Sequence, residues 1–276
     1  MKKTFSFFIT LFFIWSSPSF SQLFPVYPEK EIGQAEIIIE YLQTYQIDSL
    51  NSRTRKDHMI LLIGSNTSWF YSEAYYSFNK TANRFSTIAE LEAFTNNPVT
   101  RPRSTDFRYE IFKNYPEGKI TTTDHIPSDR YLYTEDLPLF EWEITDDTAS
   151  ISGYKVQRAT THFGGREWIA WFAPDIPYND GPYKFNGLPG LILKIHDTRN
   201  HYAFEVVSID APKEKTPILF TERTYIRTTK EGFSRAWNSF RESFIGNTEM
   251  IPDSHSRHIM SENLRRNNNP IELTAD

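Results

Sequence analysis

Residues 154–172 read YKVQRATTHF-GG-REWIAWF, two alternating runs on either side of a glycine pair. Gly164-Gly165 is typical of a two-residue hairpin turn, because the central positions of that turn need φ above 0°. A second pair of runs follows at 191–196 and 201–208, around the turn-forming residues 197–200. These two hairpins predict a mainly β fold.

The corner between the two hairpins is rich in glycine and proline. It contains Pro174, Pro177, Gly181-Pro182 and the hexapeptide GLPGLI at 187–192. Leu188, Pro189 and Gly190 fit a type II turn, with proline fixing φ at the second position and glycine supplying a positive φ at the third. Gly187 leaves room for close backbone approach. The structural interpretation is a turn into a buried strand at 191–195; the functional alternative is that its backbone N–H groups bind an anion.

The first 21 residues have the pattern of a secretory signal peptide. Lys2-Lys3 precedes an apolar run from Phe5 to Trp15, and Ser19-Phe20-Ser21 is a small-x-small cleavage site. An uncleaved N-terminal anchor is the alternative, but the run is shorter than the roughly 20 apolar residues of a membrane span. We expect an exported protein, periplasmic or secreted, without a transmembrane segment after cleavage, and one β domain over 22–251.

The composition excludes several classes of site. The chain has no cysteine, which rules out disulfides, thiolate metal sites and a lipoprotein anchor. It carries 35 acidic against 30 basic residues, so binding to nucleic acid or to anionic lipid is not expected. The aromatic content, 22 Phe, 15 Tyr and 6 Trp, favours strands.

Alternation and turn signals along the rest of the chain predict further strands. They are expected at 35–47, 58–64, 66–71, 107–115, 119–126, 131–134, 139–144 and 218–227, with the apolar run 58–64 buried on both faces and Asp146-Asp147 forming a turn. With the central hairpins this gives about ten strands, in an antiparallel curved sheet or half-barrel. A β-sandwich remains an alternative at this stage.

Two stretches favour helices. Ser86 or Thr87 is placed to cap a short helix that carries Ile88, Leu91 and Phe94. Residues 230–245 predict an amphipathic helix that covers one face of the sheet and ends before Gly246; its apolar stripe is Phe233, Trp237, Phe240 and Phe244. Residues 252–276 are polar and without periodicity, and are expected to form a loose tail.

Candidate ligand-binding residues gather around the corner. Arg158 and Arg166 lie on adjacent strands of the first hairpin, where two guanidinium groups would suit a carboxylate or phosphate; cross-strand pairing with Glu167 or solvent exposure is the alternative. Aromatic residues in this region either pack in the core or line a groove for an apolar or sugar ligand. The candidate set is Arg158, Arg166, Trp168, Trp171, Tyr183 and Phe185.

Other polar residues give weaker signals. His196 and His201 flank the turn 197–200, so a simple hairpin would place them opposite each other as two possible metal ligands; a zinc site needs three or four. The spacing of Glu167, Asp175 and Asp180 does not predict that any two of them lie close enough for acid–base catalysis. His255 and His258 fall in the polar tail. No cofactor is expected, and P-loops, serine elbows and dinucleotide fingerprints are absent.

The central stretch resembles the GLPGLI family of exported Bacteroidetes proteins, which takes its name from the hexapeptide at 187–192. Further similar segments are 153–154, 158–160, 163–166, 170–172, 176–177 and 181–182, together with the NNNPIEL segment at 267–273. The resemblance implies an exported, mostly β protein, and the family has no established activity. The expected function is therefore a non-enzymatic envelope binding or accessory protein, whose partner is a small apolar ligand or an outer-membrane protein. A periplasmic hydrolase using Asp175, Asp180 or His196, or a metal-binding protein, is the alternative.

Overall fold

The computed structural model describes residues 26–127, 129–246 and 254–274, and one open, curved sheet dominates it. Its strands are β1 (Glu29–Tyr45), β2 (Arg55–Gly64), β3 (Ser68–Ser72), β4 (Glu110–Lys113), β5 (Lys119–Ile126), β6 (Asp129–Asp136), β7 (Glu143–Ile151), β8 (Tyr154–Phe163), β9 (Arg166–Ala173), β10 (Leu191–Asp197), β11 (Tyr202–Asp210), β12 (Pro217–Thr221) and β13 (Ile226–Arg227). The helices are α1 (Glu73–Ala82), α2 (Ile88–Asn96), α3 (Lys230–Gly246) and α4 (Ser254–Arg266).

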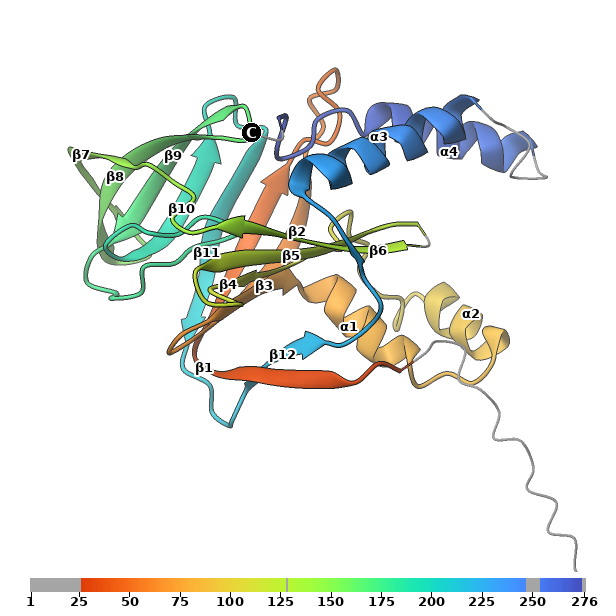
Figure 1. The fold of residues 1–276 in the computed structure, drawn as a ribbon, viewed down its shortest axis with the longest axis horizontal. Coiled ribbons are helices and arrows are strands. Elements are labelled where there is room, and N and C mark those ends of the chain that lie inside the picture. Colours follow the sequence, from red (N-terminus) through yellow and green to blue (C-terminus); the bar gives the residue numbers. More distant parts are fainter. Residues whose placement is uncertain (1–25, 128, 247–253, 275–276) are drawn as a thin grey trace, which may run out of the picture.

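The strand order is β13-β6-β5-β4-β3-β2-β1-β11-β10-β9-β8-β7, with β12 paired to the start of β1. Neighbours are antiparallel except β13 and β6. The direction of the strands changes along the sheet: β9 and β10 run steeply in Figure 1, whereas β5 and β6 lie across them. The predicted antiparallel curved sheet is confirmed, with thirteen strands instead of about ten, and the sandwich alternative is wrong.

Both faces of the sheet are covered near β2, as the apolar run 58–64 predicted. Met59, Leu61 and Ile63 belong to the main core, inside the curve of the sheet. Leu62 belongs to a second, smaller core on the opposite face, which also includes Trp69, Phe112 and Ile218. Because side chains alternate along a strand, an uninterrupted apolar run supplies both cores.

The glycine pair 164–165 forms the predicted hairpin turn, with φ values of 58° and 72°. The glycines have a second role that the sequence did not indicate. A Cβ on Gly164 would lie 3.0 Å from the Cα of Glu272, and the Leu273 N–H donates to the Gly164 carbonyl at 2.7 Å. The turn is therefore also the platform on which the C-terminal segment lies.

The expectation of a loose C-terminal tail is wrong. Residues 254–266 form α4, which packs beside α3 (Figure 1). The segment after α4 is held by buried contacts: the Tyr202 hydroxyl donates to the Asn269 carbonyl at 2.7 Å, and the Asn269 side chain donates to the Gln46 carbonyl at 2.6 Å. Local polarity hid this segment because its stability comes from contacts with residues far away in the sequence.

Helices α1 and α3 cover opposite faces of the sheet, over different strands. The predicted helix 230–245 is confirmed as α3, whose Phe233 ring lies 5.5 Å from Tyr131 on the main-core side. On the other side, α1 packs against β2 and β3. Thr87 caps α2 through a capping box with Glu90, as one of the two predicted caps. Among the described residues, none of the helices combines the length and the apolar character that crossing a membrane requires.

Three predicted local features differ in the structure. Asp146-Asp147 lies within β7 at a register irregularity, and the turn falls at Ser152-Gly153, where both φ values are positive. The predicted strand 218–227 is divided into β12 and β13, which join different strands of the sheet. Residues 188–191 do not close a hydrogen-bonded type II turn: Gly190 has the expected positive φ, at 149°, but its N–H donates to the Leu188 carbonyl at 2.8 Å and the Leu191 N–H donates to the Ile176 carbonyl.

Candidate functional site

The aromatic residues around the corner pack inside the protein. Trp168 and Phe185 are fully buried, with ring centroids 4.7 Å apart. Tyr183 is buried as well, and its hydroxyl donates to the Glu272 carboxylate. Trp171 is partly exposed. Ligand binding by these residues stays a prediction, and their burial favours the core-packing interpretation.

The two arginines of the first hairpin are not brought together. Arg158 pairs in register with Trp171 and Arg166 with Phe163, so the two lie towards opposite ends of the hairpin. Arg158 is partly exposed, with its guanidinium 3.5 Å from Asp147. The expectation of two adjacent guanidinium groups is therefore wrong.

Arg166 is buried and fixes the C-terminal segment. Its Nη1 donates to Asp197 at 2.9 Å, while Nη2 donates to the Asn269 side chain at 2.7 Å and to the Pro270 carbonyl at 2.6 Å. Its Nε donates to the Ile271 carbonyl at 2.9 Å. These contacts occupy the guanidinium with protein acceptors.

The histidine and carboxylate candidates do not form a shared site. His196 pairs with Ala203 and not with His201, because the register of β10 and β11 differs by two residues from that of a symmetric turn at 197–200; the predicted opposition is wrong. Asp175 is exposed, and Asp180 forms an ion pair with Lys113. Within residues 26–127, 129–246 and 254–274, no three His, Asp or Glu side chains are grouped to hold a metal ion.

The corner itself is held by a buried lysine that sequence reasoning missed. Lys113 Nζ on β4 donates to the carbonyls of Gly181 and Tyr183 at 2.5 and 3.1 Å, beside its ion pair with Asp180. The Gly187 N–H donates to the Asn179 carbonyl at 3.0 Å. The corner thus points carbonyl groups at the Lys113 ammonium, and its N–H groups donate to acceptors within the protein. This favours a structural role for the corner over anion binding by its N–H groups.

A second buried lysine joins the corner to the C-terminal segment. Lys184 Nζ lies 2.5 Å from Glu135 and 2.7 Å from Glu272, and Lys230 of α3 also lies 2.5 Å from Glu272. Burial alone lowers the pKa of Lys184, but the charges of Glu272 and Glu135 outweigh it and raise that pKa above its usual value. The cluster is an ion network inside the protein.

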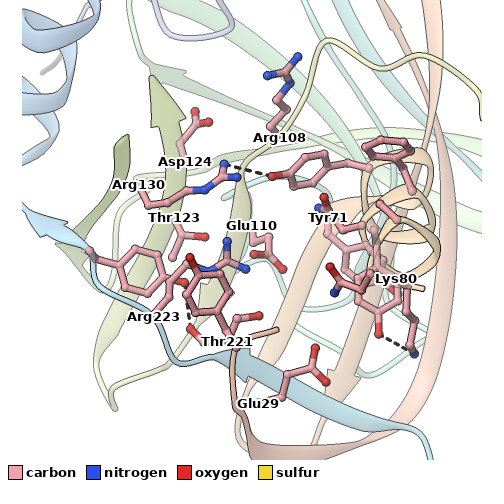
Figure 2. Close-up of a pocket in the computed structure, with 18 residues that line it drawn as sticks. Glu29, Tyr71, Lys80, Arg108, Glu110, Thr123, Asp124, Arg130, Thr221 and Arg223 are labelled. Atoms are coloured by element: carbon pink, nitrogen blue, oxygen red, sulfur yellow. Dashed lines mark hydrogen bonds between the residues drawn. The ribbon is translucent and has the colours of Figure 1, made fainter. Parts of the chain in front are cut away.

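A pocket outside the corner is the candidate site. It lies between α1, the β1–β12 ribbon and the β3–β6 part of the sheet, and has a volume of about 200 Å³ (Figure 2). Its lining residues are Tyr27, Glu29, Tyr71, Tyr75, Tyr76, Phe78, Asn79, Lys80, Ala82, Asn83, Arg108, Glu110, Thr123, Asp124, Arg130, Thr221, Arg223 and Tyr225. None of the six predicted ligand-binding residues is among them.

Three arginines line this pocket, and none forms an ion pair with a described residue. Arg130 donates from Nη1 to the Tyr75 hydroxyl at 3.2 Å, and the guanidinium of Arg223 lies 4.6 Å from the centre of the Tyr27 ring. Arg108 lies 2.7 Å from Nε2 of His125. Figure 2 shows Arg130, Arg223 and Glu110 converging on the same hollow. A guanidinium binds a carboxylate strongly, and these three form no such pair with a described residue. Their positive charge is therefore available to bind a ligand.

Burial shifts the titratable groups of the pocket towards their neutral forms. It raises the pKa of Glu110 to about 7, although Arg223 acts in the opposite direction. It also raises the pKa of Asp124 to about 6. Together with Arg130 and Arg108, burial lowers the pKa of His125, which lies next to Asp124 but does not line the pocket, to about 3. His125 is therefore neutral, and its Nε2 accepts from Arg108. Near pH 7 the pocket holds more positive than negative charge.

Comparisons with known proteins identify one family whose model matches a segment of this chain, and one protein whose structure has a similar fold. Residues 164–194 match the model of Porph_ging, described as a protein of unknown function. No curated protein matches the chain. Two crystal structures of PNGF-II, in space groups C2 and P21, have a TM-score of 0.50 with 16% and 15% identity, over 75% and 74% of this chain. The chain spans 33% of PNGF-II, and at this identity the likeness shows the fold alone. Over its central stretch, which includes both Gly164-Gly165 and the hexapeptide, the chain is similar to the Porph_ging family.

Proposed function

We propose that this protein is an exported, non-enzymatic binding protein of the GLPGLI type, and that it captures a small ligand in the pocket between α1 and the sheet. Export is supported by the signal-like pattern of residues 1–21. The family assignment is supported by the segment 164–194 and its hexapeptide.

The observation that carries the binding function is the combination of arginines and tyrosines around one hollow. Tyr71, Tyr75, Tyr76 and Tyr225 supply ring faces and hydroxyls, while Arg130 and Arg223 supply donors. Ligand pockets combine such apolar faces with a few convergent polar groups. A volume of about 200 Å³ is below the roughly 300–1,000 Å³ of drug-sized pockets, so a small ligand fits.

Native mass spectrometry of the mature protein, purified from its own envelope, tests this proposal. We expect the wild type to carry a small molecule, Arg223→Gln to lose it, and Arg158→Gln to keep it. Arg158 is a matched control because it is a partly exposed arginine outside the pocket. An empty wild-type monomer would count against the proposal and favour a protein partner, such as one in the outer membrane. If Arg158→Gln or Trp171→Ala loses the small molecule while Arg223→Gln keeps it, the ligand binds at the corner and not in the pocket.

A hydrolase is the second candidate function, and Glu110 is the observation that favours it. A carboxyl with a pKa of about 7 suits general acid–base catalysis at neutral pH. This candidate predicts turnover that Glu110→Gln removes while the ligand still binds. If turnover persists in Glu110→Gln, this candidate is wrong.

A further inference from the structure

We propose that the pocket recognises an anionic group, a carboxylate or a phosphate ester, through the guanidinium groups of Arg130 and Arg223. This inference rests on the proposed function, since it names the class of ligand for the same pocket.

Arg223 has a donor without a protein acceptor. Its Nε is buried and makes no hydrogen bond to a described residue, while its guanidinium lies over the Tyr27 ring. A buried donor without an acceptor destabilises a protein, so its presence needs a ligand, an ion or water as partner. A carboxylate or phosphate oxygen is the acceptor that a guanidinium binds best, because the two groups match in shape and charge.

Arg130 approaches the same hollow from β6. The described residues give it one side-chain acceptor, the Tyr75 hydroxyl at 3.2 Å, although a guanidinium carries five N–H donors. Its remaining donors and those of Arg223 lie on the same side of the pocket as Glu110 (Figure 2). Two arginines from different elements can therefore bind one anionic group together.

The neighbouring carboxylates do not neutralise this pair. Glu29 lies at the exposed start of β1, and Glu110 is partly protonated near pH 7 because burial raises its pKa. Asp124 is the remaining acidic group, against Arg108 and Lys80 as further cations. A small anion would balance the excess positive charge, whereas a cation would add to it.

Titration calorimetry with three ring compounds of similar size tests the inference. Phenyl phosphate and benzoate carry the anionic group, and benzyl alcohol is the neutral probe. We expect at least one anion to bind wild-type protein about 10-fold or more tighter than benzyl alcohol, because bonds to charged groups are stronger. Preference between the two anions distinguishes phosphate from carboxylate.

The variants locate the binding site. Arg223→Gln and Arg130→Gln should each weaken anion binding by about 10- to 100-fold. Arg265→Gln, at an exposed arginine outside the pocket, should leave it unchanged. Thermal unfolding identifies any variant that fails to fold; Arg223→Lys then gives the same test with the charge retained, and should bind at intermediate strength.

Two results would overturn the inference. If benzyl alcohol binds as tightly as the anions and Arg223→Gln changes nothing, the pocket is a site for neutral ligands and the proposed binding function survives. If no probe binds the wild type at millimolar concentration, anion recognition is wrong, and the native mass spectrum decides the binding function independently.

Discussion

Replacing Glu110 by glutamine should stabilise the protein at neutral and higher pH. Glu110 lies on β4 between Tyr71 of β3 and Thr123 of β5, its partners in the neighbouring strands. Burial raises its pKa from 4.5 to about 7, so the folded protein binds this proton more tightly than the unfolded chain. Glutamine keeps the shape of the side chain but never carries the charge.

The magnitude follows from the difference between the folded and unfolded pKa of Glu110. Each pKa unit corresponds to about 1.4 kcal/mol, so the full shift is equivalent to about 3 kcal/mol. Solvent still reaches part of this pocket residue, which reduces the expected effect to about 1–2 kcal/mol. The wild type carries no penalty below pH 4.5, loses stability as the pH rises to about 7, and keeps the full penalty above it.

Urea unfolding of the wild type and Glu110→Gln, at about pH 5 and about pH 8, measures this effect. We expect the variant to gain about 1–2 kcal/mol relative to the wild type between the two pH values. Glu117→Gln, at an exposed position of the β4–β5 turn, is the matched control and should show no such gain. A constant difference between wild type and Glu110→Gln across the pH range would refute the reasoning.

Three further predictions follow from the same contacts. Glu272→Gln should cost about 3–5 kcal/mol in urea unfolding, because buried Lys184 loses a charge partner; an effect below about 1 kcal/mol, as for a surface pair, would contradict this. Gly190→Ala should lower the thermal midpoint more than Gly187→Ala, because the new Cβ would lie 2.2 Å from the Ala173 carbonyl oxygen while none lies that close at Gly187; equal losses would show that the close approach has no cost. Anion affinity should fall as the pH rises through about 7, because the charge of Glu110 then repels the ligand, and calorimetry in two buffers should detect proton uptake; pH-independent affinity would argue against Glu110 as a neighbour of the ligand.

Local signals predicted the strands and helices that short segments determine. The glycine pair 164–165 set the first hairpin, the apolar run 58–64 indicated a strand between two cores, and the stripe from Phe233 to Phe244 indicated α3. Each of these depends on residues a few positions apart. The sequence was less informative about the pairing register of the strands: His196 faces Ala203 because the register of β10 and β11 is shifted by two residues from that of a symmetric turn.

The pocket could not be predicted from the sequence because its walls come from five separate segments, within 27–29, 71–83, 108–110, 123–130 and 221–225. Tyr27 and Glu29 lie about two hundred positions from Arg223, and α1 lies between them in the chain. The three arginines of the pocket lie far apart in the sequence and belong to no recognisable motif, so the sequence does not indicate that they share a site. Lys113 and Lys184 read as ordinary polar residues, and their burial depends on carboxylates and carbonyls supplied by other elements.

A crystal structure of the protein together with any small molecule that it retains on purification would test the central claim most directly. The account predicts ligand density between α1 and the sheet, with anionic oxygens about 3 Å from Nε of Arg223 and from the guanidinium of Arg130. Density beside Trp171 and the corner 174–190, with the pocket holding only water, would contradict it.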